Sequence, residues 1–147
     1  MKVTKKSEYA VRALIEIVIR SHSDKQWHQI SQIASATDIP DKFLEQILLT
    51  LKRGGLLQSR RGIDGGYALN VPAAKMTLDQ VILALEGSMM AEMTKGSGDE
   101  GLDVFIECVG DAEKAAIEVL SSQTIEDLAR RAEEKRQQRS DSMEFQI

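Results

Sequence analysis

The clearest structural pattern in the chain lies in residues 28–55, HQISQIASATDIPDKFLEQILLTLKRGG. Apolar residues at helical spacing predict a short helix over His28–Thr37, followed by a turn that ends at Pro40. Proline cannot continue a helix, but its fixed φ fits the first turn of the next one. A second helix is therefore predicted over Pro40–Arg53, with the two glycines after it as a left-handed stop.

Each of these two helices carries an inward apolar face. The inward residues are Ile30, Ile33 and Ala34 in the first helix and Phe43, Leu44, Ile47, Leu48 and Leu51 in the second. Two helices joined by a tight turn are typical of a helix-turn-helix, whose second helix enters the major groove of DNA.

A basic hairpin is predicted directly after the second helix. Strands at Leu56–Arg60 and Tyr67–Leu69 enclose the sequence RGIDGG, whose Asp-Gly-Gly permits the positive φ values of a tight turn. Glycine allows close approach to DNA, and arginine favours the negative potential of a narrow minor groove. We expect Tyr67 to pack at the hairpin base. The order of elements predicts a winged helix-turn-helix.

The segment before this motif predicts an amphipathic helix over Thr4–Ser21. Besides its main apolar face it carries a second stripe of Val11, Ile15 and Ile19, so the helix must be covered on two sides. Its own domain is one cover, and a partner helix is the candidate for the other.

Three more helices are predicted after the hairpin. Thr77 and Gln80 form a capping box that opens the first, which ends at Gly87. Apolar periodicity from Leu102 to Leu120 predicts a long helix, and its apolar residues are Phe105, Ile106, Val109, Ala112, Ala116, Val119 and Leu120. Thr124 with Asp127 caps the last helix, and we expect its polar part, Glu133–Ser140, to be frayed or solvated.

The predicted fold class is mainly α, with a small two-stranded β wing and a long dimerisation helix. We expect a winged helix-turn-helix DNA-binding domain at 1–87 and a linker at 88–101. A helical dimerisation region at 102–140 and a C-terminal tail at 141–147 follow.

Composition and charge restrict the class of protein. The chain has 147 residues, of which 42% are hydrophobic and 29% charged, as in ordinary globular domains. No apolar run is long enough for a membrane span and no secretory signal is present, and a single cysteine, Cys108, suits a reducing cytosol. We therefore expect a cytoplasmic protein that does not enter membranes.

The net charge of -4 is unevenly distributed. Residues 1–75 hold 12 Lys+Arg and 7 Asp+Glu, a net charge of +5, whereas residues 76–147 hold 7 and 16, a net charge of −9. This asymmetry indicates that only the first half faces a polyanion such as DNA.

Several short motifs resemble one bacterial family of regulators. They are Met1-Lys2-Val3-Thr4-Lys5, Tyr9-Ala10, Phe43-Leu44-Glu45-Gln46, Gly55-Leu56, Arg61-Gly62, Gly65-Gly66-Tyr67-Ala68-Leu69 and Leu85-Glu86-Gly87. Together they resemble the family of winged helix-turn-helix regulators that includes the iron–sulfur cluster regulator IscR, the cysteine-metabolism repressor CymR and the nitrite-sensitive repressor NsrR. The resemblance implies a homodimer on double-stranded DNA, in which the long helix crosses to the partner subunit and covers the second stripe of the first helix.

The sensing mechanism differs from that of the cluster-binding members. Those members use three cysteines in the linker, and residues 88–101 contain none. An iron–sulfur cluster is therefore not expected, and no cofactor or metal is predicted. The chain is nearer the CymR type, which senses through a protein partner, and the sequence does not identify the effector.

The candidate DNA-binding residues come from four places in the chain. They are Lys5 and Lys6, then Ser31 and Gln32, then Lys42, Glu45 and Gln46, and finally Arg60, Arg61 and Gly62 of the wing. Glutamate accepts from cytosine N4 and glutamine pairs with adenine, whereas Lys5, Lys6, Ser31 and Gln32 are assigned to phosphates. Glu45 is equally suited to an ion pair within the chain, and the two lysines to a solvated terminus.

Three other functions find less support in the sequence. The sequence contains no phosphate-binding loop, zinc-protease motif or activated nucleophile, so we expect no enzyme. A metal- or cluster-sensing regulator with unusual ligands would draw on Glu8, His22, His28 and Cys108, and Cys108 is also the candidate redox residue. A winged helix that binds protein would not require the arginines of the wing. We predict a sequence-specific transcription regulator, a repressor that binds a pseudo-palindromic operator as a homodimer.

Overall fold

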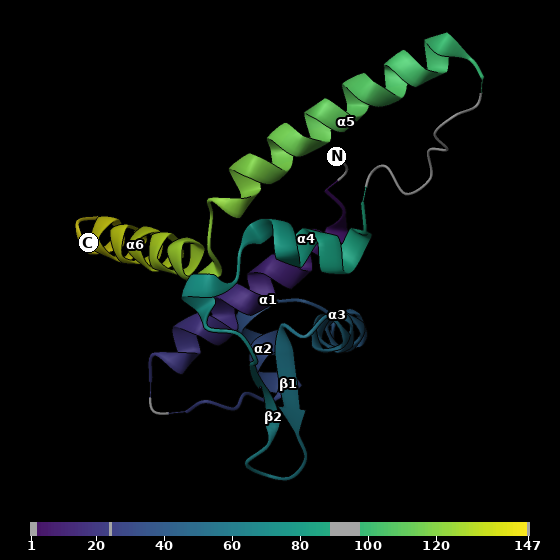
Figure 1. The fold of residues 1–147 in the computed structure, drawn as a ribbon. Helices are drawn as coiled ribbons and strands as arrows, with labels where there is room; N and C mark the ends of the chain where they lie inside the picture. The colour runs from purple at the N-terminus through teal and green to yellow at the C-terminus, as the bar shows by residue number, and fades with distance from the viewer. Residues whose placement is uncertain (1–2, 24, 89–97, 147) are drawn as a thin grey trace.

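The computed structural model describes residues 3–23, 25–88 and 98–146. It is mainly helical with a two-stranded antiparallel sheet, as predicted (Figure 1). In chain order the elements are α1 (Lys5–Ser21), α2 (Ile30–Thr37), α3 (Asp41–Arg53), β1 (Leu57–Arg60), β2 (Gly66–Leu69), the 3-10 turn η1 (Ala73–Lys75), α4 (Leu78–Glu86), α5 (Glu100–Ser121) and α6 (Ile125–Glu144).

Helix α1 forms the centre of the core. It packs against α2, α3, α4 and α6. Ala10, Leu14 and Ile17 are spaced by four and three residues, so they share one face, and none of them is exposed. Leu44, Leu48 and Leu51 of α3 are equally buried and belong to the same apolar cluster. This cluster fixes α3 relative to α1, which determines where α3 presents its outer face.

The predicted helix starts at Thr77 and Thr124 are confirmed. The Thr77 backbone N–H donates to Gln80 Oε1 at 3.1 Å. The Asp127 N–H donates to Thr124 Oγ1 at 3.1 Å, and the Thr124 N–H donates to Asp127 Oδ2 at 3.3 Å. Each cap satisfies backbone donors that have no partner within the helix.

The wing strands pair in the register Leu57↔Leu69 and Arg60↔Gly66. His28 lies beside them: its N–H donates to Tyr67 O at 2.9 Å and its carbonyl accepts from the Tyr67 N–H at 2.8 Å. The start at His28 that was predicted for the short helix before the turn is therefore wrong. The backbone of His28 extends the wing sheet, and α2 begins at Ile30.

The C-terminal part departs from the prediction in its last residues. Helix α6 continues to Glu144, so most of the tail predicted at 141–147 is helical, while residues 134–140 are exposed, in agreement with the expected solvated end. Ile125 and Ala129 at its start are fully buried in the core cluster. Helix α6 packs along α1, so part of the cover of α1 comes from its own chain rather than from a partner alone.

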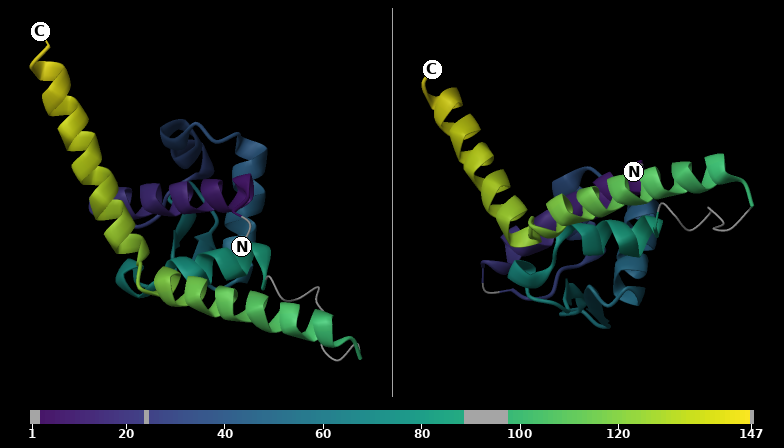
Figure 2. Two further views of the ribbon diagram at one scale, coloured as in Figure 1. Left: turned by 90° about the horizontal axis from the view of Figure 1, so that it is seen from above. Right: turned by 45° about the horizontal axis from the view of Figure 1, so that its top comes forward.

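Helix α5 projects away from the rest of the molecule, as the views in Figure 2 show. Among the described residues, the main neighbour of α5 is α4. The two helices pack together near the C-terminal end of α5. The predicted linker at 88–101 falls largely on residues 89–97, which lie outside the described residues. In the parts that are described, no helix is both long and apolar enough to cross a membrane.

Candidate nucleic-acid interface

Helix α3 presents a polar outer face. Its opposite side is buried through Leu44, Ile47, Leu48 and Leu51, because these residues repeat at intervals of three and four. Lys42, Glu45 and Gln46 therefore project outward, and all three are exposed. This geometry suits a helix that reads base edges in a major groove.

Phe43 does not belong to the inward stripe to which it was assigned. Its side chain is 59% exposed, and its ring centroid lies 6.5 Å from that of Tyr9. Arg12 and Lys5 lie over the same Tyr9 ring, at 5.8 and 5.6 Å. The first turn of α3 is thus flanked by an aromatic and basic group from α1.

The wing loop is held by hydrogen bonds to two of its carbonyls. Gln29 Nε2 donates to Ile63 O at 2.8 Å, and Arg60 Nη2 donates to Asp64 O at 2.6 Å. Gly65 is buried, and a Cβ there would lie 2.2 Å from Arg60 O, so the close turn requires glycine. The tip itself, Arg61 to Ile63, is fully open to solvent, and Ile63 is 92% exposed.

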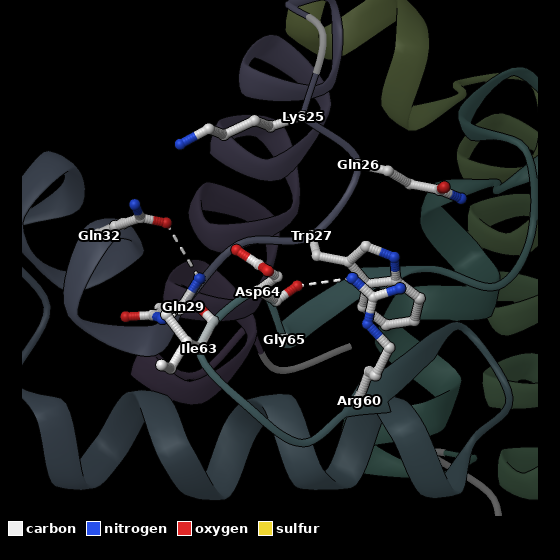
Figure 3. A pocket seen from close by; sticks show the side chains of 9 residues that line it. All are labelled: Lys25, Gln26, Trp27, Gln29, Gln32, Arg60, Ile63, Asp64 and Gly65. Atoms are coloured by element: carbon white, nitrogen blue, oxygen red, sulfur yellow. Dashed lines mark hydrogen bonds between the residues drawn. The ribbon is translucent and has the colours of Figure 1, made fainter.

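A pocket of about 220 Å³ lies between the start of α2 and the wing loop (Figure 3). Its lining residues are Lys25, Gln26, Trp27, Gln29, Gln32, Arg60, Ile63, Asp64 and Gly65. The Arg60 guanidinium stacks on the Trp27 ring, with 4.5 Å between Cζ and the ring centroid. Sequence reasoning did not select Trp27 or Gln29; the one available signal was that Trp27 is the only tryptophan of the chain.

The predicted phosphate contacts do not all lie together. Ser31 and Gln32 lie on the first turn of α2, and Gln32 lines the pocket beside the wing loop, where its Oε1 accepts from the Gln29 N–H at 3.1 Å. Lys5 pairs with Glu8 at 2.8 Å, and Lys6 Nζ donates to the Leu85 carbonyl at 3.2 Å. The two lysines are therefore engaged at the end of α1 that lies against α4.

The base of the wing is shielded from water. Burial lowers the pKa of His28, assisted by the positive charges of Arg20 and Lys25, and the imidazole lies 3.2 Å from Ser21 Oγ. Burial also raises the pKa of Tyr67, with a smaller contribution from Glu45. Tyr67 packs against the core cluster, which confirms its predicted place at the hairpin base.

An exposed helix held by a second short helix, with an arginine-tipped hairpin beside it, defines a winged helix-turn-helix regulator of transcription. A family model named Rrf2, described as an iron-dependent transcriptional regulator, matches residues 3–131. The chain belongs to this family of DNA-binding transcription regulators, which confirms the resemblance seen in its motifs; the relatives named below are regulators of transcription and not enzymes.

Individual relatives agree with the family model. A putative HTH-type transcriptional regulator of Synechocystis sp. is 37% identical over 89 residues, which cover 60% of this chain and 59% of that protein. The regulator IscR of Vibrio vulnificus is 35% identical over 99 residues, covering 67% of this chain and 58% of that protein. The match thus spans less than two thirds of these relatives' own length.

Solved structures cover more of the chain. The structure of CymR, the global cysteine regulator of B. subtilis, has a TM-score of 0.69 at 28% identity and covers 88% of this chain and 96% of its own. IscR of T. potens has a TM-score of 0.70 at 28% identity and covers 92% and 90%. The fold therefore extends beyond the DNA-binding part to the helices that follow it.

The residues present do not fit an iron–sulfur cluster held by thiolates. The sequence supplies one cysteine, Cys108, which is exposed on α5. Where residues are described, no group of three His, Cys, Asp or Glu side chains comes together as a metal site. Glu8 pairs with Lys5 and Arg12, while His22 lies 3.3 Å from Glu126. The hypothetical set of Glu8, His22, His28 and Cys108 is thus not assembled within this chain.

Proposed function

We propose that the protein is a homodimeric repressor that binds a pseudo-palindromic operator. The observation that carries the proposal is the open polar face of α3, with Lys42, Glu45 and Gln46 exposed, beside a wing whose Arg61 projects into solvent. In this mode each α3 enters a major groove, and the two half-sites lie about one helical turn, roughly 34 Å, apart. Such a protein acts in the cytoplasm, where bacterial DNA is located.

Helix α5 supports the homodimer. Leu102, Phe105, Val109, Ala112, Ala116 and Val119 follow a spacing of three and four residues along it. That spacing is typical of helices that pair along an apolar seam. Phe105 and Val119 are 57% and 65% exposed in the single chain, so these two seam residues are not covered by the described part of their own chain. A second copy of α5 is the partner whose pattern matches.

The proposed regulator works without a bound iron–sulfur cluster. With one cysteine, the chain lacks the thiolates for such a cluster, and we propose that it responds to a different effector. The CymR structure, which is covered over 96% of its own length, is that of the global cysteine regulator of B. subtilis, and this makes sulfur metabolism the first place to look for target genes.

The experiment is a selection from sheared DNA of the source organism at two salt concentrations, followed by sequencing. Wild type, Arg61→Ala and Arg130→Ala are compared; Arg130 lies on α6, exposed and away from the wing. We expect wild type and Arg130→Ala to enrich the same few promoter fragments that share a pseudo-palindrome. Arg61→Ala should bind them more weakly by about 1–3 kcal/mol, because it loses a groove contact.

Two outcomes would contradict this proposal. No enrichment by a folded dimer, with or without cell extract to supply an effector, means that the winged helix does not act on DNA. If Arg61→Ala enriches the same fragments as strongly as wild type, the protein still acts as a DNA-binding regulator, but Arg61 does not make the proposed groove contact.

A further inference from the structure

The two adjacent arginines of the wing have different surroundings. Arg60 is the last residue of β1 and is engaged twice, by the Trp27 ring at 4.5 Å and by the Asp64 carbonyl at 2.6 Å. Within the described residues, Arg61 has no hydrogen bond or ion pair, and it is exposed. Figure 3 shows the Arg60 guanidinium against the Trp27 ring, with its hydrogen bond to the Asp64 carbonyl drawn as a dashed line.

Trp27 is itself fixed in place. It precedes His28, whose two backbone hydrogen bonds to Tyr67 attach this segment to β2. The indole is half-buried and lies on the α2 side of the wing. A ring anchored to β2 and stacked on the end of β1 restrains the two strands at the point where the loop begins.

The loop bonds extend this restraint to the tip. Arg60 holds the Asp64 carbonyl, Gln29 holds the Ile63 carbonyl at 2.8 Å, and Gly65 N donates to Gly62 O at 3.0 Å. Arg61, Gly62 and the Ile63 side chain project from this restrained loop. A loop held in one conformation loses less entropy when it binds, so it binds more tightly than a free loop with the same side chains.

We infer that Trp27, through its stack on Arg60, is a positioning residue that delivers Arg61 to DNA. This rests on the proposed function and assigns Arg60 to the support of the wing, whereas sequence alone grouped it with Arg61 as a DNA contact. A guanidinium stacked on an aromatic face and hydrogen-bonded at its edge is held in place, and arginine suits both contacts at once. The wing therefore reaches the groove with one arginine.

The stack is tested first without DNA. Trp27 is the only tryptophan, so fluorescence and its quenching by acrylamide report on this ring alone. Arg60→Ala uncovers one face of the indole and should increase the quenching constant, whereas Arg61→Ala should leave it at the wild-type value. Equal quenching in wild type and Arg60→Ala overturns the inference.

The effect on DNA is tested by a double-mutant cycle on a promoter fragment enriched by wild type. Trp27→Ala should weaken binding about fivefold, the effect expected of one lost cation–π contact. In the Arg61→Ala background the same substitution should have little further effect, because it acts through Arg61. Residues that act independently give additive losses, so additivity between Trp27 and Arg61 overturns the inference.

Controls separate positioning from folding. Trp27→Tyr keeps an aromatic face and should recover most of the affinity that Trp27→Ala loses. Lys25→Ala removes a charge from the same pocket without touching the stack. Any loss of DNA affinity that it causes should add to the loss caused by Arg61→Ala. A wild type that binds no fragment overturns the proposed function and this inference together; a wild type that binds, with additive losses, overturns this inference alone.

Discussion

Gly66 lies where β2 passes closest to His28. Its φ is +129°, and a Cβ would lie 2.2 Å from the His28 carbonyl oxygen, an atom fixed by its bond to Tyr67. Gly66→Ala combines backbone strain with a clash against fixed backbone. We expect it to reduce the free energy of unfolding by about 3 kcal/mol, measured by urea denaturation.

Gly62 provides the matched control. Its φ of +108° is also unfavourable for alanine, but a Cβ there meets no atom within 4 Å. Gly62→Ala should therefore cost about 1 kcal/mol, from the backbone conformation alone. If the two substitutions destabilise the protein equally, the close approach of Gly66 to His28 is not what requires a glycine.

His28 makes the stability depend on pH. Its pKa is lowered in the folded protein, first by burial and then by Arg20 and Lys25, while Glu16 opposes them. Below the ordinary histidine pKa of 6.5 the unfolded chain takes up a proton that the folded protein does not. Stability should therefore fall as the pH falls from about 6.5 towards the pKa of the folded protein, and be unaffected by this group above that range.

The measurement is urea unfolding at several pH values between about 7.5 and 5.5. His28→Gln removes the titrating group and should flatten the decline. His22→Gln, which changes the other of the two histidines, should retain it. A decline that persists undiminished in His28→Gln assigns the pH dependence to another group.

At the scale of elements, one ion-pair network ties α6 to α1. The Glu16 side chain is only 7% exposed, and its two oxygens accept from Arg20 Nε at 3.1 Å and from Arg136 Nη2 at 3.0 Å. Arg136→Met leaves one carboxylate oxygen of a nearly buried group without its donor. We expect a loss of about 1–2 kcal/mol in unfolding free energy.

Arg130→Met is the comparison for that prediction. Arg130 pairs with Glu134 at 3.1 Å, but both side chains are more than half exposed, so the loss should be under about 0.5 kcal/mol. Both variants remove one positive charge from α6. Equal effects would show that the buried setting of Glu16 contributes nothing to the docking of α6.

The sequence predicted the elements well where their signals are local. Apolar periodicity identified the helices, and capping side chains identified the helix starts at Thr77 and Thr124. Both kinds of signal depend on residues only a few positions apart in the chain. The start of α2 was misplaced because the backbone of His28 pairs with that of Tyr67, 39 positions later in the chain. No local sequence pattern reveals this pairing. The exposed setting of Phe43 and the stack of Trp27 on Arg60 likewise depend on tertiary contacts.

At the scale of the whole molecule, basic and acidic residues lie in different parts of the fold. The basic first 75 residues form the helix-turn-helix and the wing, while the acidic remainder forms α4, α5 and α6. Helix α5 carries six acidic residues and one lysine, so it is unsuited to lie on DNA. Its exposed apolar seam is then best explained by another copy of the chain, which would place two wings and two α3 helices on one duplex.

Phe105→Glu tests this arrangement. A charge within the exposed seam should prevent pairing of α5 while leaving the fold intact, because Phe105 is 57% exposed in the single chain. We expect a monomer by light scattering, with the helical far-UV signal of wild type. Binding to a fragment with both half-sites should fall about 100-fold, because the two DNA contacts are no longer linked, whereas binding to a single half-site should change little.

Lys114→Gln makes the same change in charge on an exposed position of α5 away from the seam and should remain dimeric. A Phe105→Glu protein that is still a dimer would show that the subunits meet elsewhere, and a monomer that keeps full affinity for the double site would show that dimerisation does not support binding.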